Sequence, residues 1–143
     1  MSFGFRGAVL AATLLGAASA ASAQTARTTT VQAGKTIRMA VVTGLKKDCS
    51  LGQPGGIRII TTPKSGQLAV EGGKTKTPAS FRCPNVETPI QQLLYKAKPG
   101  FTGTDEIAYE TRTPEGETQS FTVKITVTDK APASGSKGGL VDL

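Results

Sequence analysis

The sequence predicts an all-β protein that folds as one antiparallel sandwich of about seven strands. A chain of 143 residues has room for a single domain, and no segment shows the apolar spacing of an amphipathic helix. Segments with strand character recur instead, and turns rich in glycine and proline separate them at roughly eight to twelve residues. A small barrel is the alternative architecture. Because 38% of the residues are apolar and only 5% are aromatic, the expected core is mainly aliphatic.

Seven segments have the β-branched content or the alternation of strands. In chain order they are residues 28–32, 36–42, 56–62, 67–70, 93–96, 106–113 and 118–128. The first is a run of threonine and valine, the second has apolar residues at alternate positions, and the third is rich in isoleucine. The fourth follows the turn that Pro63 and Gly66 favour. The fifth is short and ends before Pro99 and Gly100.

The last two expected strands form the clearest hairpin. The sixth places Ile107 and Tyr109 on one face, and a turn containing Pro114 and Gly116 leads into the seventh. In the seventh, apolar residues alternate with polar ones along the whole segment.

Two segments lack strand character. The pair Gly72-Gly73 predicts a turn, and residues 74–88 show so little alternation that we expect a loop there. Residues 129–143, rich in glycine, serine and lysine, predict a flexible C-terminal tail. The sandwich domain is therefore expected at residues 24–128.

The first 23 residues have the organisation of a secretory signal peptide. Arg6 is their only charged residue, residues 8–20 are an uncharged apolar run, and Ala21-Ser22-Ala23 predicts cleavage before Gln24. A membrane anchor, the alternative, needs a longer and bulkier run. We therefore expect a periplasmic or secreted protein without a stable membrane anchor.

The two cysteines, Cys49 and Cys83, predict one structural disulfide. Export exposes them to oxidation, and two cysteines allow only one pairing within the chain. A redox-active pair, the alternative, is typical of cysteines close together in sequence, whereas these are 34 positions apart.

The late segment of the domain carries a family motif. Its residues at fixed offsets are Tyr95, Gly100, Phe101, Gly103, Asp105 and Tyr109. This segment resembles the closing part of bacterial immunoglobulin-like and cadherin-like domains, and residues 62–68 resemble an earlier turn of the same modules. The resemblance implies an antiparallel immunoglobulin-like β-sandwich with structural roles for these six residues. The sequence departs from the family at Ala97 and Ile107, and it lacks the acidic turn after Tyr109 that would suggest calcium.

The composition argues against an enzyme. The chain has no histidine, which removes Ser-His-Asp and Cys-His nucleophile systems and histidine-bearing zinc sites. The only candidates for paired-carboxylate catalysis are Asp105, Glu106, Glu110, Glu115 and Glu117, and we expect them to form an exposed acidic face. We expect no catalytic residue, no cofactor and no metal site.

The charges are unevenly distributed. Residues 24–98 contain 12 basic and 3 acidic residues, whereas residues 99–143 contain 4 and 7. The candidate binding residues are Lys46, Lys47, Arg58, Lys64, Lys74, Lys76, Arg82, Lys96 and Lys98. They predict a basic surface for an anionic envelope polymer, phospholipid headgroups or an acidic exported protein, and not for nucleic acid. The alternatives are a solubilising surface without a partner, or a structural module that assembles with itself or docks through a strand edge.

Overall fold

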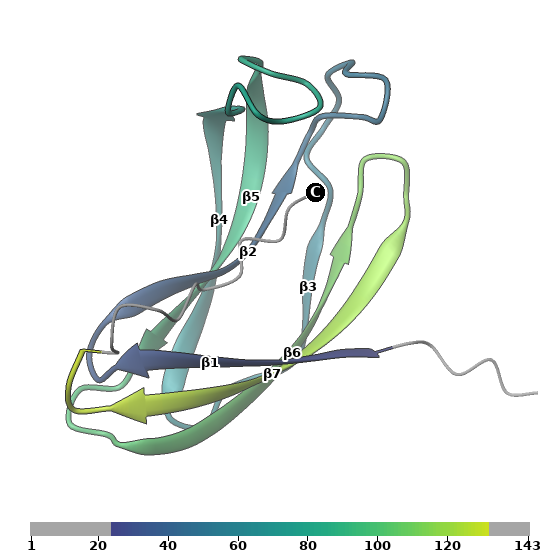
Figure 1. Ribbon diagram of the computed structural model, residues 1–143. Coiled ribbons are helices and arrows are strands. Elements are labelled where there is room, and N and C mark those ends of the chain that lie inside the picture. The colour runs from purple at the N-terminus through teal and green to yellow at the C-terminus, as the bar shows by residue number, and fades with distance from the viewer. Residues whose placement is uncertain (1–23, 132–143) are drawn as a thin grey trace, which may run out of the picture.

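The computed structural model describes residues 24–131, which form two facing sheets without a helix (Figure 1). The strands are β1 (Gln24–Gln32), β2 (Thr36–Thr43), β3 (Ile57–Thr61), β4 (Gly66–Lys76), β5 (Glu87–Ala97), β6 (Gly103–Arg112) and β7 (Thr118–Thr128). The expected all-β sandwich of about seven strands is confirmed. The expected signal peptide, residues 1–23, and residues 132–143 of the expected tail lie outside the described residues.

The strand order matches that of an immunoglobulin-like sandwich except for the first strand, which lies in the other sheet. One sheet has the order β1-β7-β6-β3 and the other has the order β2-β5-β4. All hydrogen-bonded neighbours are antiparallel except β1 and β7, which run in the same direction (Figure 1).

The turn after β1 accounts for this parallel pair. The N–H of Ala33 donates to the carbonyl of Thr128 at 2.8 Å, and the N–H of Gly34 donates to the carbonyl of Ala97 at 3.1 Å. The turn is therefore bonded to the end of β7 in one sheet and to the end of β5 in the other. Gly34 lies between the two sheets and has a φ of 76°, a conformation that favours glycine. As a result, β1 lies along β7 and ends where β7 ends.

The core lies between the sheets and is mainly aliphatic, as the composition predicts. Alternate residues of β7 from Phe121 to Val127 are buried, Ile107 of β6 lies beside Val123 in the same sheet, and Leu93 of β5 packs in the same core from the other sheet. The rings of Tyr109 and Phe121 stack with their centroids 5.2 Å apart. Alternation along β7 therefore identified the buried face of the most regular strand correctly.

The β4–β5 hairpin is longer than the sequence predicts. The expected turn at Gly72-Gly73 is wrong, because both glycines lie within β4 and pair with β5 in an unbroken register that continues to Lys76 opposite Glu87. The expected loop at residues 74–88 shortens to residues 77–86. Glycine is permissive rather than turn-forming, so the pairing with β5 decides its conformation here.

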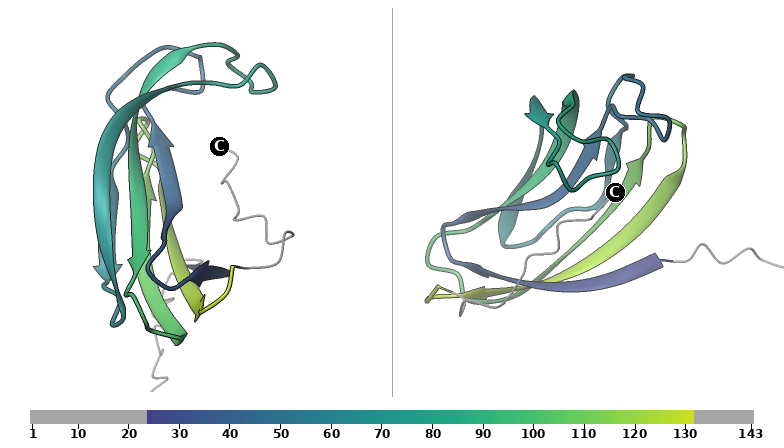
Figure 2. Two further views of the ribbon diagram at one scale, coloured as in Figure 1. Left: turned by 90° about the vertical axis from the view of Figure 1, so that its left-hand side faces the viewer. Right: turned by 45° about the horizontal axis from the view of Figure 1, so that its top comes forward.

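The sandwich has two different ends. The disulfide end contains residues 44–56, 77–86 and 113–117, and the first two of these segments lie side by side there (Figures 1 and 2). The lysine end, opposite it, contains residues 33–35, 62–65 and 98–102. Within residues 24–131, no helix is long and apolar enough to cross a membrane.

Candidate functional site

The structure divides the basic residues expected to bind a partner between the two ends. Those at or near the disulfide end are Lys46, Lys47, Arg58, Lys74, Lys76 and Arg82. Those at the lysine end are Lys64, Lys96 and Lys98. The nine residues therefore form two groups at opposite ends of the sandwich.

The disulfide end is held together by covalent and polar contacts. Cys49 and Cys83 are bonded with an S–S distance of 2.00 Å, so the expected pairing is present. Cys83 is buried, and the guanidinium of Arg82 donates to the carbonyl of Lys46 at 3.2 Å. The loops that follow β2 and β4 are thus one connected unit, and the disulfide indicates an oxidising compartment outside the cytoplasm.

Carboxylates neutralise much of the positive charge at the disulfide end. The ammonium of Lys47 lies 2.5 Å from a carboxylate oxygen of Glu117, and its backbone N–H donates to Glu115 at 2.6 Å. The hydrogen bond to Glu117 raises the pKa of Lys47, and the N–H of Lys47 lowers the pKa of Glu115. Two further ion pairs join Arg58 to Glu110 and Lys74 to Glu87.

The lysine end is different. Its lysine group consists of Lys35, Lys64, Lys96 and Lys98, and all four residues are exposed. Within the described part of the chain, none of them has a carboxylate within 4.0 Å. No ion pair therefore neutralises these four ammonium groups, although Asp105 and Glu106 lie beside the turn that carries Lys64.

Backbone contacts bring the lysine group together from three segments. The N–H of Lys98 donates to the carbonyl of Ser65 at 3.1 Å, beside Lys64. The N–H of Ala97 donates to the carbonyl of Lys35 at 3.0 Å. The sequence analysis missed Lys35, because only the pairing of β2 with β5 places it beside the other three.

Asp105 fixes the turn that carries Lys64. It is 5% exposed, and its oxygens accept the backbone N–H groups of Lys64 and Ser65 at 2.9 and 2.8 Å. They also accept the N–H of Glu106 at 2.9 Å and the hydroxyl of Tyr95 at 3.1 Å. Burial alone would raise the pKa of Asp105, but these donors outweigh it and lower the pKa below its usual value.

The side chain of Tyr95 packs against this turn from the core. Burial, together with its hydrogen bond to Asp105, raises the pKa of its hydroxyl. Its ring also lies so close to Gly66 that a Cβ at that position would approach a ring carbon within 2.5 Å. The turn before β4 is therefore held both by packing against the Tyr95 ring and by hydrogen bonds to Asp105.

The remaining motif residues occupy structural positions. Phe101 packs against the core, and Gly100 and Gly103 have φ values of 77° and 140°. The hydroxyl of Tyr109 donates to the carbonyl of Met39 across the sandwich at 3.2 Å. Gly100, Phe101 and Gly103 therefore lie at the lysine end of the sandwich, whereas Tyr109 lies nearer the disulfide end.

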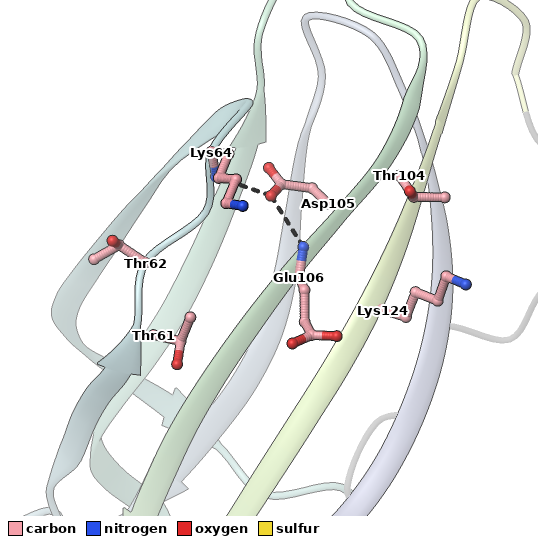
Figure 3. A pocket seen from close by; sticks show the side chains of 7 residues that line it. All are labelled: Thr61, Thr62, Lys64, Thr104, Asp105, Glu106 and Lys124. Atoms are coloured by element: carbon pink, nitrogen blue, oxygen red, sulfur yellow. Dashed lines mark hydrogen bonds between the residues drawn. The ribbon is translucent and has the colours of Figure 1, made fainter.

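A shallow polar hollow of about 420 Å³ lies beside the same turn (Figure 3). Its lining residues are Thr61, Thr62, Lys64, Thr104, Asp105, Glu106 and Lys124. The dashed lines in Figure 3 show that Asp105 is engaged with the backbone of Lys64 and Glu106. The hollow therefore offers threonine hydroxyls, the ammonium groups of Lys64 and Lys124 and the carboxylate of Glu106, a mixed lining that suits hydrogen bonding.

Of the five expected acidic candidates, Glu106 lines the hollow and the other four contact other groups. Asp105 binds backbone N–H groups, Glu110 pairs with Arg58, and Glu115 and Glu117 both contact Lys47. Within residues 24–131, no three cysteine or carboxylate side chains are grouped so that they could hold a metal ion.

Comparisons with known proteins place this chain in no family. No family model matches it, and no curated protein matches it. Among solved structures, the solution structure of Amebosin aligns with a TM-score of 0.44 and 14% identity, over 74% of this chain and 99% of that chain. We draw nothing about fold or function from so weak a likeness.

Proposed function

We propose that this protein is a non-enzymatic binding module, exported to the periplasm or secreted, that binds an anionic partner through the lysine group. The observation that carries the proposal is the position of Lys35, Lys64, Lys96 and Lys98, which three segments bring together without a carboxylate partner. A cluster of exposed like charges raises the local concentration of opposite charge and steers its encounter.

The alternative use of these charges, a purely solubilising surface, accounts less well for their arrangement. Solubility depends on net charge and needs no particular placement. Here Asp105, the hydroxyl of Tyr95 and the packing of Gly66 fix the turn that carries Lys64. A held lysine suits recognition, because less side-chain and loop freedom has to be lost on binding.

Membership in the bacterial immunoglobulin-like and cadherin-like modules is part of this proposal. The strand order and the positions of Gly103, Asp105 and Tyr109 support it. Modules of this class bind through their surfaces, and the proposed ligand is either an acidic exported protein or an anionic envelope polymer.

The test is charge reversal at one end of the sandwich with a matched control at the other. The test variant changes Lys64, Lys96 and Lys98 to glutamate, and the control changes Lys46, Arg58 and Arg82, which lie outside β4, to glutamate. Both variants change the net charge equally. Association with polyglutamate and with polyphosphate is measured at low and at high salt, using the chain that begins at Gln24.

We expect the lysine-end variant to lose at least ~10-fold in association rate at low salt, whereas the control keeps most of its rate. Wild-type binding should weaken as salt shortens the Debye length from about 10 Å to 3 Å. A preference between polyglutamate and polyphosphate distinguishes the two sources of the anion. Equal losses in the two variants would show that only net charge matters and would contradict the proposal.

A further inference from the structure

We propose that the free edge of β4 accepts an extended acidic segment of a partner protein as an additional strand. This inference rests on the proposed function for one point, that the partner is anionic. It names the partner as a polypeptide, and it names the main chain of β4 as the part that binds it.

The backbone of β4 has one unpaired side. β4 lies at the end of its sheet and pairs with β5 on the other side over all 11 residues. Two hydrogen bonds bracket this pairing, from the N–H of Lys98 to Ser65 at 3.1 Å and from the N–H of Thr77 to Val86 at 2.9 Å. Because bonded pairs alternate in an antiparallel ladder, the odd-numbered residues between Ser65 and Thr77 bond to β5. The even-numbered residues therefore direct their N–H and C=O groups to the free edge.

Each other edge strand has a feature that opposes further pairing. The register of β2 shifts between Arg38 and Ala40, and the short β3 shifts between Ile59 and Thr61. On β1 the guanidinium of Arg27 points inward, 4.6 Å from the centroid of a core ring. Bulges, short length and inward charges are the usual protections of sheet edges.

From Gly66 to Gly73 the β4 edge has none of these protections, and its lysines, Lys74 and Lys76, lie only near its end. Its pairing has no register shift, and the strand contains no proline. Of the edges in the described residues, it is the longest and the most regular. An incoming strand would find an unbroken row of unpaired main-chain groups there.

The side chains along this edge specify an acidic partner. Leu68 and Val70 are in the middle of the edge on the face toward the core, and Val70 remains 41% exposed. Lys64 precedes the strand, and Lys74 and Lys76 end it. A complementary strand has apolar residues at its centre and carboxylates at both ends.

The same charges disfavour a second copy of this chain as the occupant. In antiparallel pairing centred on Val70, Lys64 of each copy would lie opposite Lys76 of the other copy. In pairing centred on Glu71, the Glu71 side chains of the two copies would lie opposite each other. Pairing centred on Gly72 places Val70 opposite Lys74. None of these registers joins apolar residues without opposing like charges.

The probe is a synthetic peptide of eleven residues, the length of β4. Threonines occupy its even positions, two valines occupy the central odd positions, and aspartates occupy the outer odd ones. A second peptide carries N-methyl groups at the valines, whose N–H groups would face β4. A third carries them at the threonines of positions 4 and 8, which flank the valines and whose N–H groups would face away. All three have the same charge.

The protein variants are Gly72→Pro and its control Gly72→Ala. Proline removes an N–H that points to the free edge and leaves the bonds to β5 intact. Alanine keeps that N–H, and there is room for it, because its Cβ would lie 3.9 Å from the nearest atom, the carbonyl oxygen of Ile90. Dissociation constants are measured by fluorescence anisotropy of the labelled peptides.

We expect Gly72→Pro to weaken binding of the unmodified peptide at least ~10-fold and Gly72→Ala to change it less than ~2-fold. Methylation at the valines should weaken binding to the unaltered protein by a similar factor, and methylation at the threonines should not. The methylated peptides keep the test decisive even if the proline variant fails to fold.

Equal binding of all three peptides would overturn strand addition while leaving attraction of an anionic partner in place. If neither the peptides nor polyglutamate nor polyphosphate bind, both proposals fall. Dimerisation that Gly72→Pro abolishes would assign the edge to a second copy and would overturn an acidic partner.

Discussion

A single buried carboxylate organises the lysine end. Asp105 receives three backbone N–H groups and one hydroxyl, and these donors come from β5, from β6 and from the turn before β4. A buried ionised group is stable only when such donors replace its water. Asp105 therefore acts as a positioning residue. It fixes the backbone of Lys64, and the four donors within the protein stabilise its own negative charge.

We predict that Asp105→Asn lowers the free energy of unfolding at pH 7 by about 2–4 kcal/mol, because an amide cannot accept all of these donors. The pKa of Asp105 is lowered in the fold, so its contribution is complete above the unfolded value of about 3.9. It is lost as the pH falls through the lower folded value. The difference between wild type and variant should therefore shrink in acid.

Urea unfolding between pH 7 and pH 2.5 measures this difference. The control is Glu106→Gln, which changes an exposed neighbour and should cost less than about 0.5 kcal/mol. A cost of Asp105→Asn that stays constant across the whole pH range would contradict the assignment.

At the scale of elements, the disulfide joins two loops that share few other contacts. It links the segment after β2 to the segment after β4, and it closes a chain loop across a sequence separation of 34 residues. The long β4–β5 hairpin projects toward this junction (Figure 2). Without the bond, the tip of the hairpin would retain mainly the contact from Arg82 to Lys46.

We predict that changing Cys49 and Cys83 to serine lowers stability by about 4 kcal/mol, the loop-closure entropy that the chain regains when unfolded. The melting temperature should fall by at least about 10 °C. Reductant should produce the same fall in the wild-type protein and no change in the double variant. Free alkylation of both thiols in the native protein would show that the bond is absent.

The elements that the sequence predicts well are those with strict alternation. In the hairpin of β6 and β7, the bounds of β7 were predicted to the residue and β6 begins three residues earlier than predicted, because the apolar residues recur with the period of a strand. The hairpin of β4 and β5 was underestimated, because glycine and polar residues around Gly72 have little preference for strands on their own. Pairing with a distant segment decides their structure, and one strand considered alone carries no sign of it.

The candidate site was predicted only in part for a similar reason. Charge counting found Lys64, Lys96 and Lys98, but it did not distinguish them from Lys47 and Lys74, which the fold pairs with acids. Which lysines have acidic neighbours depends on strand order and register, and these are properties of the whole chain.

At the scale of the whole molecule, the first described residue, Gln24, already belongs to a sheet. Gln24 is the first residue of β1, pairs with Ser120 and donates from its side chain to the hydroxyl of Thr122. The cleavage expected after Ala23 would therefore leave a chain whose first residue is already part of the sheet.

We predict that the exported protein begins at Gln24, which the intact mass of purified material measures directly. Replacing the small residue Ala23 by phenylalanine should slow processing, because signal peptidases require small residues before the cut. The same replacement at Ala26, inside the mature chain, should leave processing unchanged. Exported protein that retains Met1 would contradict the prediction.

The parallel pairing of β1 with β7 also determines how the domain bears a mechanical load. β1 begins at the disulfide end and β7 finishes at the lysine end, with nine residues of β1 in register between them. A force that pulls these two strands away from each other along their length acts on all the hydrogen bonds of the ladder at once. The hydrogen bonds between β1 and β7 are then loaded in shear and must break together. In an antiparallel pair of terminal strands, the same force would break the hydrogen bonds one after another. A module placed between two tethered partners would therefore resist stretching through the one strand pair that departs from the antiparallel pattern.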